Sequence, residues 1–153
     1  MAGQKYTVDQ WVEQYRKMPK NMKLNGGISR EKIMAFLEEN NFKAPEEYIR
    51  FMELTNGGSL FGGKVTIWEI PEDDTAQIPD WKSIKYMNQE SVKSSMPDIN
   101  GVFLFAGNYL GDYIGVCMED KEFDIIYTSP DQGESWNFYT FTDWLEDMWE
   151  ELL

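Results

Sequence analysis

The sequence of 153 residues contains no histidine and only one cysteine, Cys117. Histidine is the commonest general base near neutral pH and the commonest zinc ligand. Its absence excludes a Ser-His-Asp triad and a Cys-His dyad, and with a single cysteine it also excludes a structural zinc site. One cysteine cannot form an intrachain disulfide, and the apolar run around Cys117 indicates a small buried hydrophobic side chain.

Long hydrophobic runs are missing as well. No apolar stretch approaches the roughly 20 residues that span a bilayer, and residues 1–6 are polar and lack the core of a signal peptide. We therefore expect a cytoplasmic protein without membrane contact. Hydrophobic residues still make up 42% of the chain and aromatic residues 15%, which indicates a packed core. The length fits one domain, and we expect residues 1–153 to form it.

Basic residues are scarce in the last third of the chain. Residues 101–153 contain 12 acidic side chains and one basic side chain, Lys121, whereas residues 1–100 contain 15 acidic and 13 basic ones. The net charge of −13 repels nucleic acid and anionic membranes. It also attracts a basic partner, whose association it speeds at low salt. Acidic surfaces keep proteins soluble without any specific role, so charge alone leaves both interpretations open.

A hydrophobic period near 3.6 predicts three helices in the first third of the chain. Their predicted ranges are 7–18, 29–40 and 45–55. Thr7 and Gln10 form a capping-box pattern at the start of the first helix. The third helix carries a proline near its start and ends at Asn56-Gly57-Gly58, residues that tolerate the positive φ angles of a helix end.

After Asn56-Gly57-Gly58, which form a glycine corner, the hydrophobic period falls to about 2, which predicts strands. The predicted strands are 65–70, 102–106, 113–118, 123–128 and 136–139, and residues 79–90 carry a weaker helical pattern. From residue 102 onward the strands recur about every ten residues, which indicates consecutive antiparallel hairpins. A final helix, capped by Thr142, has an apolar stripe opposite a wholly acidic face. The fold class predicted is α+β.

Three motifs in this order resemble the SUKH superfamily, in its branch related to fungal cell-wall synthesis regulators. They are the third helix with its glycine corner, the strand–loop–strand segment 103–117 and the closing segment 141–145. The resemblance spans about residues 28–149. The residues of the first motif, which we interpret as structural, are Pro45, Tyr48, Phe51, Asn56, Gly57 and Gly58.

The resemblance implies helices packed on a mixed, mostly antiparallel sheet of about five to six strands. It also implies a function, because many bacterial members are similar to immunity proteins that bind and neutralise a cognate polymorphic or contact-dependent toxin, often a nuclease. The fungal members are regulatory scaffolds without a defined catalytic site. The resemblance therefore carries over no catalytic residue.

A partner-binding surface is predicted from the chemistry of such toxins. A nuclease holds a phosphate backbone in a basic site, so an inhibitor that covers this site gains from carboxylates. Aromatic residues dominate binding hot spots. The predicted partner-binding residues are Trp68, Glu69, Glu72, Asp73, Asp74, Tyr109, Asp112, Glu119, Asp120, Asp131, Glu134 and Trp136. Taken singly, each also fits a solvated charge or a core aromatic.

Other chemistries find less support in the sequence. Glycine pairs such as Gly57-Gly58 leave a helix, whereas a phosphate loop leads into a helix N-terminus. Paired carboxylates such as Asp73 and Asp74 serve a hydrolase only when a cleft holds them about 5–10 Å apart. We predict no catalytic residue, cofactor or metal, and a non-enzymatic domain that binds a basic toxin. The alternative is a regulatory or scaffold domain for a cellular partner, and a monomer is favoured in either case.

Overall fold

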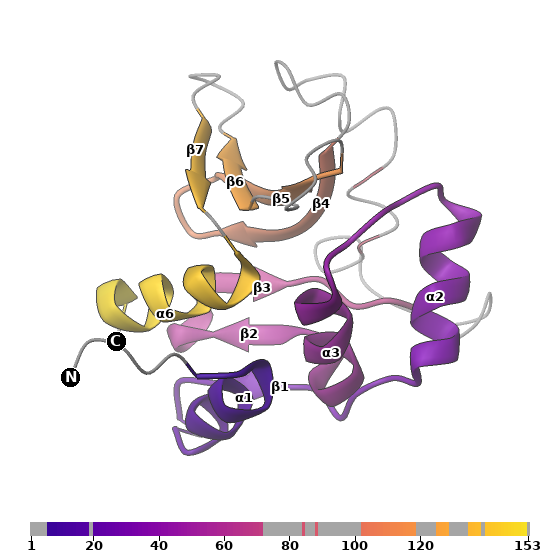
Figure 1. Cartoon of the computed structure of the whole chain (residues 1–153). Coiled ribbons are helices and arrows are strands. Elements are labelled where there is room, and N and C mark those ends of the chain that lie inside the picture. The colour runs from indigo at the N-terminus through magenta and orange to yellow at the C-terminus, as the bar shows by residue number, and fades with distance from the viewer. Residues whose placement is uncertain are drawn as a thin grey trace.

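The computed structural model describes residues 6–18, 20–71, 84, 88, 102–118, 125–128, 135–138 and 140–152. Within these ranges the chain forms four α-helices and seven β-strands (Figure 1). The helices are α1 (Val8–Arg16), α2 (Arg30–Glu39), α3 (Glu46–Thr55) and α6 (Phe141–Leu152). The strands are β1 (Lys23–Leu24), β2 (Gly58–Leu60), β3 (Val65–Ile67), β4 (Val102–Asn108), β5 (Tyr113–Cys117), β6 (Ile125–Thr128) and β7 (Ser135–Phe138).

The strands form one sheet whose order follows the chain from β1 to β7. The predicted α+β class is confirmed, with two corrections of detail. Each pair of neighbouring strands in the described sheet is antiparallel, so it is not mixed, and it has seven strands in place of five to six. The unpredicted strands β1 and β2 are two and three residues long, too short to show a hydrophobic period.

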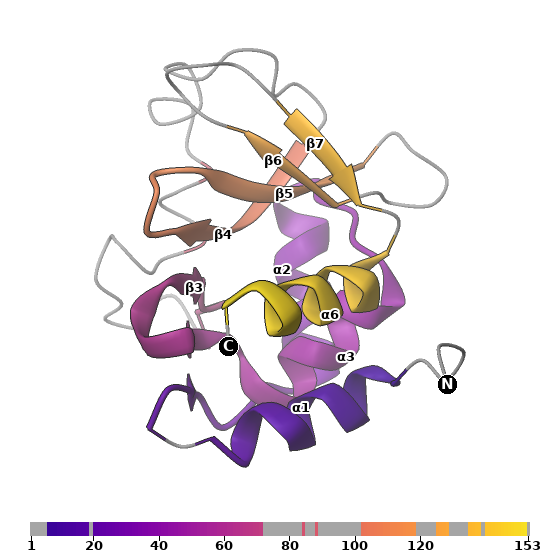
Figure 2. The same cartoon turned by 90° about the vertical axis from the view of Figure 1, so that its left-hand side faces the viewer.

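An aromatic cluster joins the sheet to α3 and α6. The ring of Phe105 in β4 lies 5.4 Å from that of Tyr48 in α3 and 5.2 Å from that of Trp144 in α6. Phe141 packs 5.9 Å from Tyr48 and 5.4 Å from Trp144, and all four side chains are fully buried. Figures 1 and 2 show α3 and α6 on the same side of the β4–β7 part of the sheet. This interface is the centre of the hydrophobic core.

The corner after α3 is held by side-chain and backbone hydrogen bonds. Asn56 adopts a left-handed conformation with φ of 48° and ends the helix. Its Nδ2 donates to the Ile70 carbonyl at 3.0 Å and its Oδ1 accepts from the Ile70 amide at 2.9 Å. The side chain thus makes the same pair of hydrogen bonds with Ile70 that the backbone of a neighbouring β-strand would make. Gly57 follows with φ of 82°, and a Cβ there would lie 2.4 Å from the Ile67 carbonyl oxygen. The corner thus fixes α3 against the chain that leaves β3.

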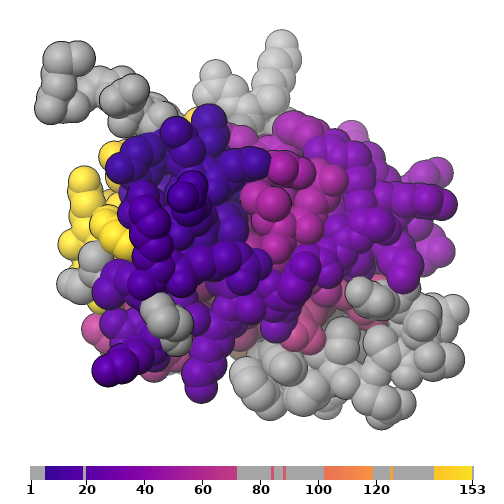
Figure 3. Space-filling model, turned by 90° about the horizontal axis from the view of Figure 1, so that it is seen from below, coloured from indigo at the N-terminus to yellow at the C-terminus, as the bar shows by residue number. Residues whose placement is uncertain are grey.

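Ion pairs connect α1, α2 and α3, which lie on the face seen in Figure 3. Arg50 of α3 donates to both carboxylate oxygens of Asp9 in α1, at 2.9 and 2.8 Å. Arg30 of α2 donates to Glu53 and Glu46 of α3. These guanidinium groups lower the pKa of Asp9 and of Glu46 through hydrogen bonds and charge attraction. Both arginines are therefore engaged within the molecule.

Local details differ from the predictions at several points. Pro45 is the N-cap of α3 and precedes its first turn. The final helix starts at Phe141, because Thr140 and not Thr142 accepts a hydrogen bond from the Asp143 amide, at 3.0 Å. The Thr142 hydroxyl donates instead to Glu47 of α3 at 2.8 Å.

Cys117, expected to be buried, is half-buried at the end of β5. The predicted helix 79–90 lies outside the described residues, apart from residues 84 and 88. None of the described helices is long and apolar enough to cross a membrane.

Candidate functional site

The turn between β4 and β5 is built by one side chain, that of Asn108. Its Oδ1 accepts hydrogen bonds from the amides of Leu110 and Asp112 at 3.1 and 2.9 Å, and its Nδ2 donates to Asp112 Oδ2 at 3.3 Å. Gly111 supplies the positive φ of 87° that the turn needs. An asparagine that bonds its own backbone in this way holds a turn rigidly before any partner arrives.

This turn presents two apolar side chains to solvent. Tyr109 is 60% exposed and Leu110 is 68% exposed, the highest values for large hydrophobic residues in the described part of the chain. The Tyr109 amide donates to the Lys64 carbonyl at 2.8 Å, which ties the turn to the segment before β3. We name Tyr109 and Leu110 the hairpin tip. Its exposure has no explanation in the packing of the core.

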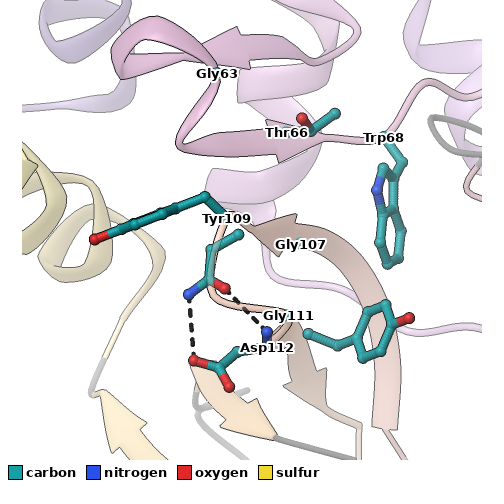
Figure 4. A pocket seen from close by; sticks show the side chains of 9 residues that line it. Gly63, Thr66, Trp68, Gly107, Tyr109, Gly111 and Asp112 are labelled. Carbon is teal, nitrogen blue, oxygen red and sulfur yellow. Dashed lines mark hydrogen bonds between the residues drawn. The ribbon is translucent and has the colours of Figure 1, made fainter.

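A hollow of about 310 Å³ lies beside the hairpin tip (Figure 4). Its described lining residues are Gly63, Thr66, Trp68, Gly107, Asn108, Tyr109, Gly111, Asp112 and Tyr113. In Figure 4 Gly107 lies between Tyr109 and Trp68, and the Tyr109 ring points away from Trp68. The rings of Trp68 and Tyr113 lie 6.0 Å apart at an angle of 58°. The hollow and the tip together form the candidate site.

Strand register places the hollow on the face of the sheet away from the helices. Thr66 pairs with Gly107, and Gly107 pairs with Tyr113, so these residues share one face. The next row, Ile67, Ala106 and Ile114, faces the other way and is fully buried. Phe103 shares that buried face, because the register of β4 shifts between Leu104 and Ala106, and its ring packs 5.6 Å from that of Tyr48 in α3.

Gly107 keeps the floor of the hollow open. A Cβ at this position would lie 3.3 Å from Trp68 Cζ2 and 3.7 Å from the Asp112 carbonyl oxygen. Trp68 itself is only 2% exposed, so it forms a fixed wall and does not project as an anchor. Asp112 is half-buried, and among the described residues its Oδ1 has no hydrogen-bond partner. Asp112 reaches the floor of the hollow with its backbone carbonyl, whereas its carboxylate is turned toward the Asn108 amide (Figure 4).

Three of the predicted partner-binding residues, Trp68, Tyr109 and Asp112, come together here. Glu69 is engaged elsewhere, accepting a hydrogen bond from Asn25 Nδ2 at 2.8 Å. Trp136 belongs to β7, where its backbone pairs with that of Tyr127. The others lie outside the described residues: Glu72, Asp73, Asp74, Glu119, Asp120, Asp131 and Glu134.

Several contributors to the site are absent from the predicted partner-binding residues. Leu110 is the most exposed of them, and Thr66, Gly107 and Asn108 shape the hollow. Asn108 could have been found, because asparagine followed by Gly111 and an aspartate is a turn signal. Thr66 and Gly107 could not, since their roles depend on the pairing of β3 with β4 across 40 residues of chain.

The described residues contain no group of three or more acidic, cysteine or histidine side chains that could hold a metal ion. What the site offers is contact surface: a rigid apolar tip, aromatic walls and a carboxylate.

The candidate site lies within the part of the chain that matches a known protein family. Residues 27–147 match the model of the SMI1 / KNR4 family (SUKH-1). The matched range includes α2, α3, β2 to β7 and most of α6, and with them the hairpin tip and the whole lining of the hollow. No curated protein matches the chain.

Proposed function

Because the chain belongs to the SMI1 / KNR4 family (SUKH-1), we propose that it is a non-enzymatic domain that binds another protein through the hairpin tip and the hollow beside it. The partner we favour is a cognate toxin with a basic surface, which this protein neutralises by contact. The exposed, preorganised hairpin tip is the observation that carries this proposal.

The tip has the properties of a binding hot spot. Tyrosine contributes a large contact area with few rotatable bonds and is enriched among hot-spot residues. Fixing a mobile interface side chain costs about 0.5–1.5 kcal/mol on binding. The hydrogen bonds that Asn108 Oδ1 accepts from the amides of Leu110 and Asp112 order the backbone of the turn in advance, so part of its ordering cost is met during folding. A partner that covers the tip thus gains apolar burial at reduced entropic cost.

Charge favours a basic partner over an acidic one. The chain carries a net charge of −13, most of it contributed by residues 101–153, the stretch that includes the tip. The exposed arginines that α2 and α3 contribute are paired with carboxylates, which limits their reach toward a partner. Long-range attraction would bring a basic protein to the acidic part of the molecule, and the tip would then provide short-range contact.

Co-purification from the native host tests the proposal. The full chain would be tagged and compared with the double variant Tyr109→Ser/Leu110→Ser and with the control Met34→Ser. Met34 lies in α2 and is 45% exposed, so the control removes a similar exposed apolar group far from the tip. We expect one protein to co-purify with the wild type and the control, and to be lost with the double variant.

The identity of the captured protein, established by mass spectrometry, decides between the two functions. A secreted protein with a toxin domain supports neutralisation. A cellular protein unrelated to toxins supports the regulatory or scaffold function. Retention of the partner by the double variant would show that the tip is not the binding site.

A further inference from the structure

The hollow beside the hairpin tip is lined by a hydrogen-bond donor, the indole nitrogen of Trp68, that the described residues leave unused. We propose that this nitrogen binds a backbone carbonyl of the partner protein, so that the hollow receives a peptide group of an extended partner segment. This inference rests on the proposed protein-binding function and adds to it the chemical group that the hollow recognises.

Trp68 is held in place without any hydrogen bond from its side chain. Its backbone amide donates to the Phe105 carbonyl at 2.9 Å, and the side chain is 2% exposed. No described residue accepts a hydrogen bond from Nε1. Among the described residues, Tyr48 is the only one with a fully buried side-chain polar atom that lacks a partner, so the Trp68 nitrogen still reaches solvent. Buried tryptophan N–H groups usually find a partner, and this one remains available to a ligand.

The unused donor faces the floor of the hollow. Figure 4 shows the nitrogen on the edge of the indole ring that is turned toward Gly107. The same edge carries Cζ2 and Cε2, which would lie 3.3 and 4.0 Å from a Cβ at position 107. Because Nε1 is bonded to Cε2, the N–H group lies beside the open backbone of Gly107.

Glycines let another polypeptide backbone come close to this donor. Gly63, Gly107 and Gly111 line the hollow without side chains. A glycine inside a strand often marks a place where a ligand or another backbone approaches closely. Gly107 does not have a positive φ, so the conformation of β4 does not require glycine there. The missing Cβ makes room for the Trp68 ring and leaves the floor beside it open.

Thr66 adds a second polar group on the same face. It lies two positions before Trp68, and alternate residues of an extended chain share one face. Within the described part of the chain its hydroxyl has no hydrogen-bond partner, and a hydroxyl can accept as well as donate. The Trp68 N–H and the Thr66 hydroxyl therefore match the carbonyl and the N–H of a peptide backbone.

A neutral acceptor suits the hollow better than an anion. The described lining contains no lysine or arginine, and its one charged residue, Asp112, turns its carboxylate toward Asn108. A carboxylate or phosphate would lose its hydration here without gaining an opposite charge, and the net charge of −13 would repel it. A peptide carbonyl pays neither cost.

An NMR titration tests the assignment on the full chain. The indole N–H signal of Trp68 in the ¹⁵N-labelled protein would be assigned from the spectrum of Trp68→Phe. The neutral tripeptide acetyl-Ala-Ala-Ala-amide would then be added. We expect a saturable downfield shift of this signal, because its proton enters a hydrogen bond. Sodium acetate at the same ionic strength offers an anionic acceptor and should cause no saturable shift.

Replacement of a single group locates the hydrogen bond. Benzothienylalanine has sulfur in place of the indole N–H and keeps the shape of the ring. Incorporated at position 68 by codon suppression, it should weaken the tripeptide about fivefold or more, because the carbonyl is left without a donor. The shifts of the Gly107 and Asp112 amides would report the affinity. The same replacement at Trp149, which is half-buried in α6 and stacked on Tyr15, is the matched control and should leave the affinity unchanged.

Gly107→Ala is a second, independent variant. Its Cβ would occupy the floor of the hollow, so it should also weaken the tripeptide. Thermal unfolding would establish that the variant is folded before its affinity is compared with that of the wild type.

Three results would overturn the inference: no saturable shift of the Trp68 indole signal, an equal shift with acetate, or unchanged affinity with sulfur at position 68. Failure of the proposed function looks different. If a partner co-purifies equally with the wild type and with the sulfur analogue at position 68, protein binding stands and the carbonyl receptor does not. If the tripeptide binds but no partner is captured, the hollow keeps its assignment and the proposed function loses its support.

Discussion

At the scale of single residues, Tyr48 combines deep burial with an unsatisfied hydroxyl. Its side chain is fully buried against Phe103, Phe105 and Phe141, and its hydroxyl has no hydrogen-bond partner among the described residues. Burial raises the pKa of Tyr48 far above its usual range, so the hydroxyl stays neutral at any physiological pH. A buried polar group without a partner costs about 1–3 kcal/mol.

Tyr48→Phe removes this hydroxyl and keeps the ring contacts. We expect the free energy of unfolding to stay the same or to rise by about 1 kcal/mol, measured by urea denaturation. A loss greater than 1 kcal/mol would mean that the hydroxyl has a favourable partner after all.

Gly57 provides a second prediction at this scale. Gly57→Ala would place a Cβ 2.4 Å from the Ile67 carbonyl oxygen at a positive φ of 82°. We expect this substitution to lower the free energy of unfolding by about 2–4 kcal/mol, since strain and a steric clash add. Gly26→Ala is the matched control, because a Cβ there meets nothing within 4 Å. Equal urea midpoints for the two variants would contradict the structural importance of the corner.

At the scale of elements, α6 places like charges close together. Asp147 is half-buried, and burial raises its pKa, with further contributions from Glu151 and Glu150. A carboxyl whose pKa is raised by folding destabilises the folded state when it is ionised, and that cost is relieved as the pH falls through the raised pKa. At neutral pH the helix therefore carries a charge that its surroundings disfavour.

Asp147→Asn removes this charge. We expect a modest increase of the melting temperature at pH 7, and we expect the difference from wild type to disappear near pH 3, where Asp147 is protonated in both the folded and the unfolded state. Thermal unfolding followed by circular dichroism at both pH values provides the measurement. Glu38→Gln in α2 is a suitable control for the loss of one exposed charge. An equal gain at pH 3 would point to a cause other than ionisation.

Elements also show which parts of the structure could be predicted from the sequence. The caps of α1 and α2 are local: Thr7 and Ser29 bond amides three residues away, so their patterns were sufficient. The predicted start of α6 was wrong by two residues, because Thr140 and Thr142 are chemically alike and either could cap the helix. A contact of Thr142 with Glu47, 95 residues earlier in the chain, decides between them. The short strand β1 depends on a partner 36 residues away, Lys23 with Ser59, and leaves no pattern of its own.

The candidate site likewise has a part that could be predicted from the sequence and a part that could not. Tyr109 and Asp112 could be proposed from composition, because exposed aromatics and acids are common in binding loops. The hollow could not be predicted, since it requires Trp68, which follows β3, to meet Tyr113 at the start of β5. That meeting depends on the register of two strand pairs.

At the scale of the whole molecule, the uneven charge determines how a partner would approach. With a net charge of −13, the association rate with a basic partner should fall roughly tenfold or more between low and high salt, while the dissociation rate changes little. Stopped-flow or surface-binding kinetics on the captured partner would measure both rates. An association rate that does not depend on salt would contradict electrostatic steering.

The turn between β4 and β5 has a consequence for how this protein could change its partner over evolution. The backbone of the turn is fixed by Asn108, Gly111 and Asp112, and the side chains of Tyr109 and Leu110 take no part in those hydrogen bonds. Positions 109 and 110 can therefore vary with little cost to folding, proline excepted, because both backbone amides donate hydrogen bonds. A library randomised at these two positions alone should yield stable proteins with altered recognition, so specificity can diversify while the scaffold stays the same.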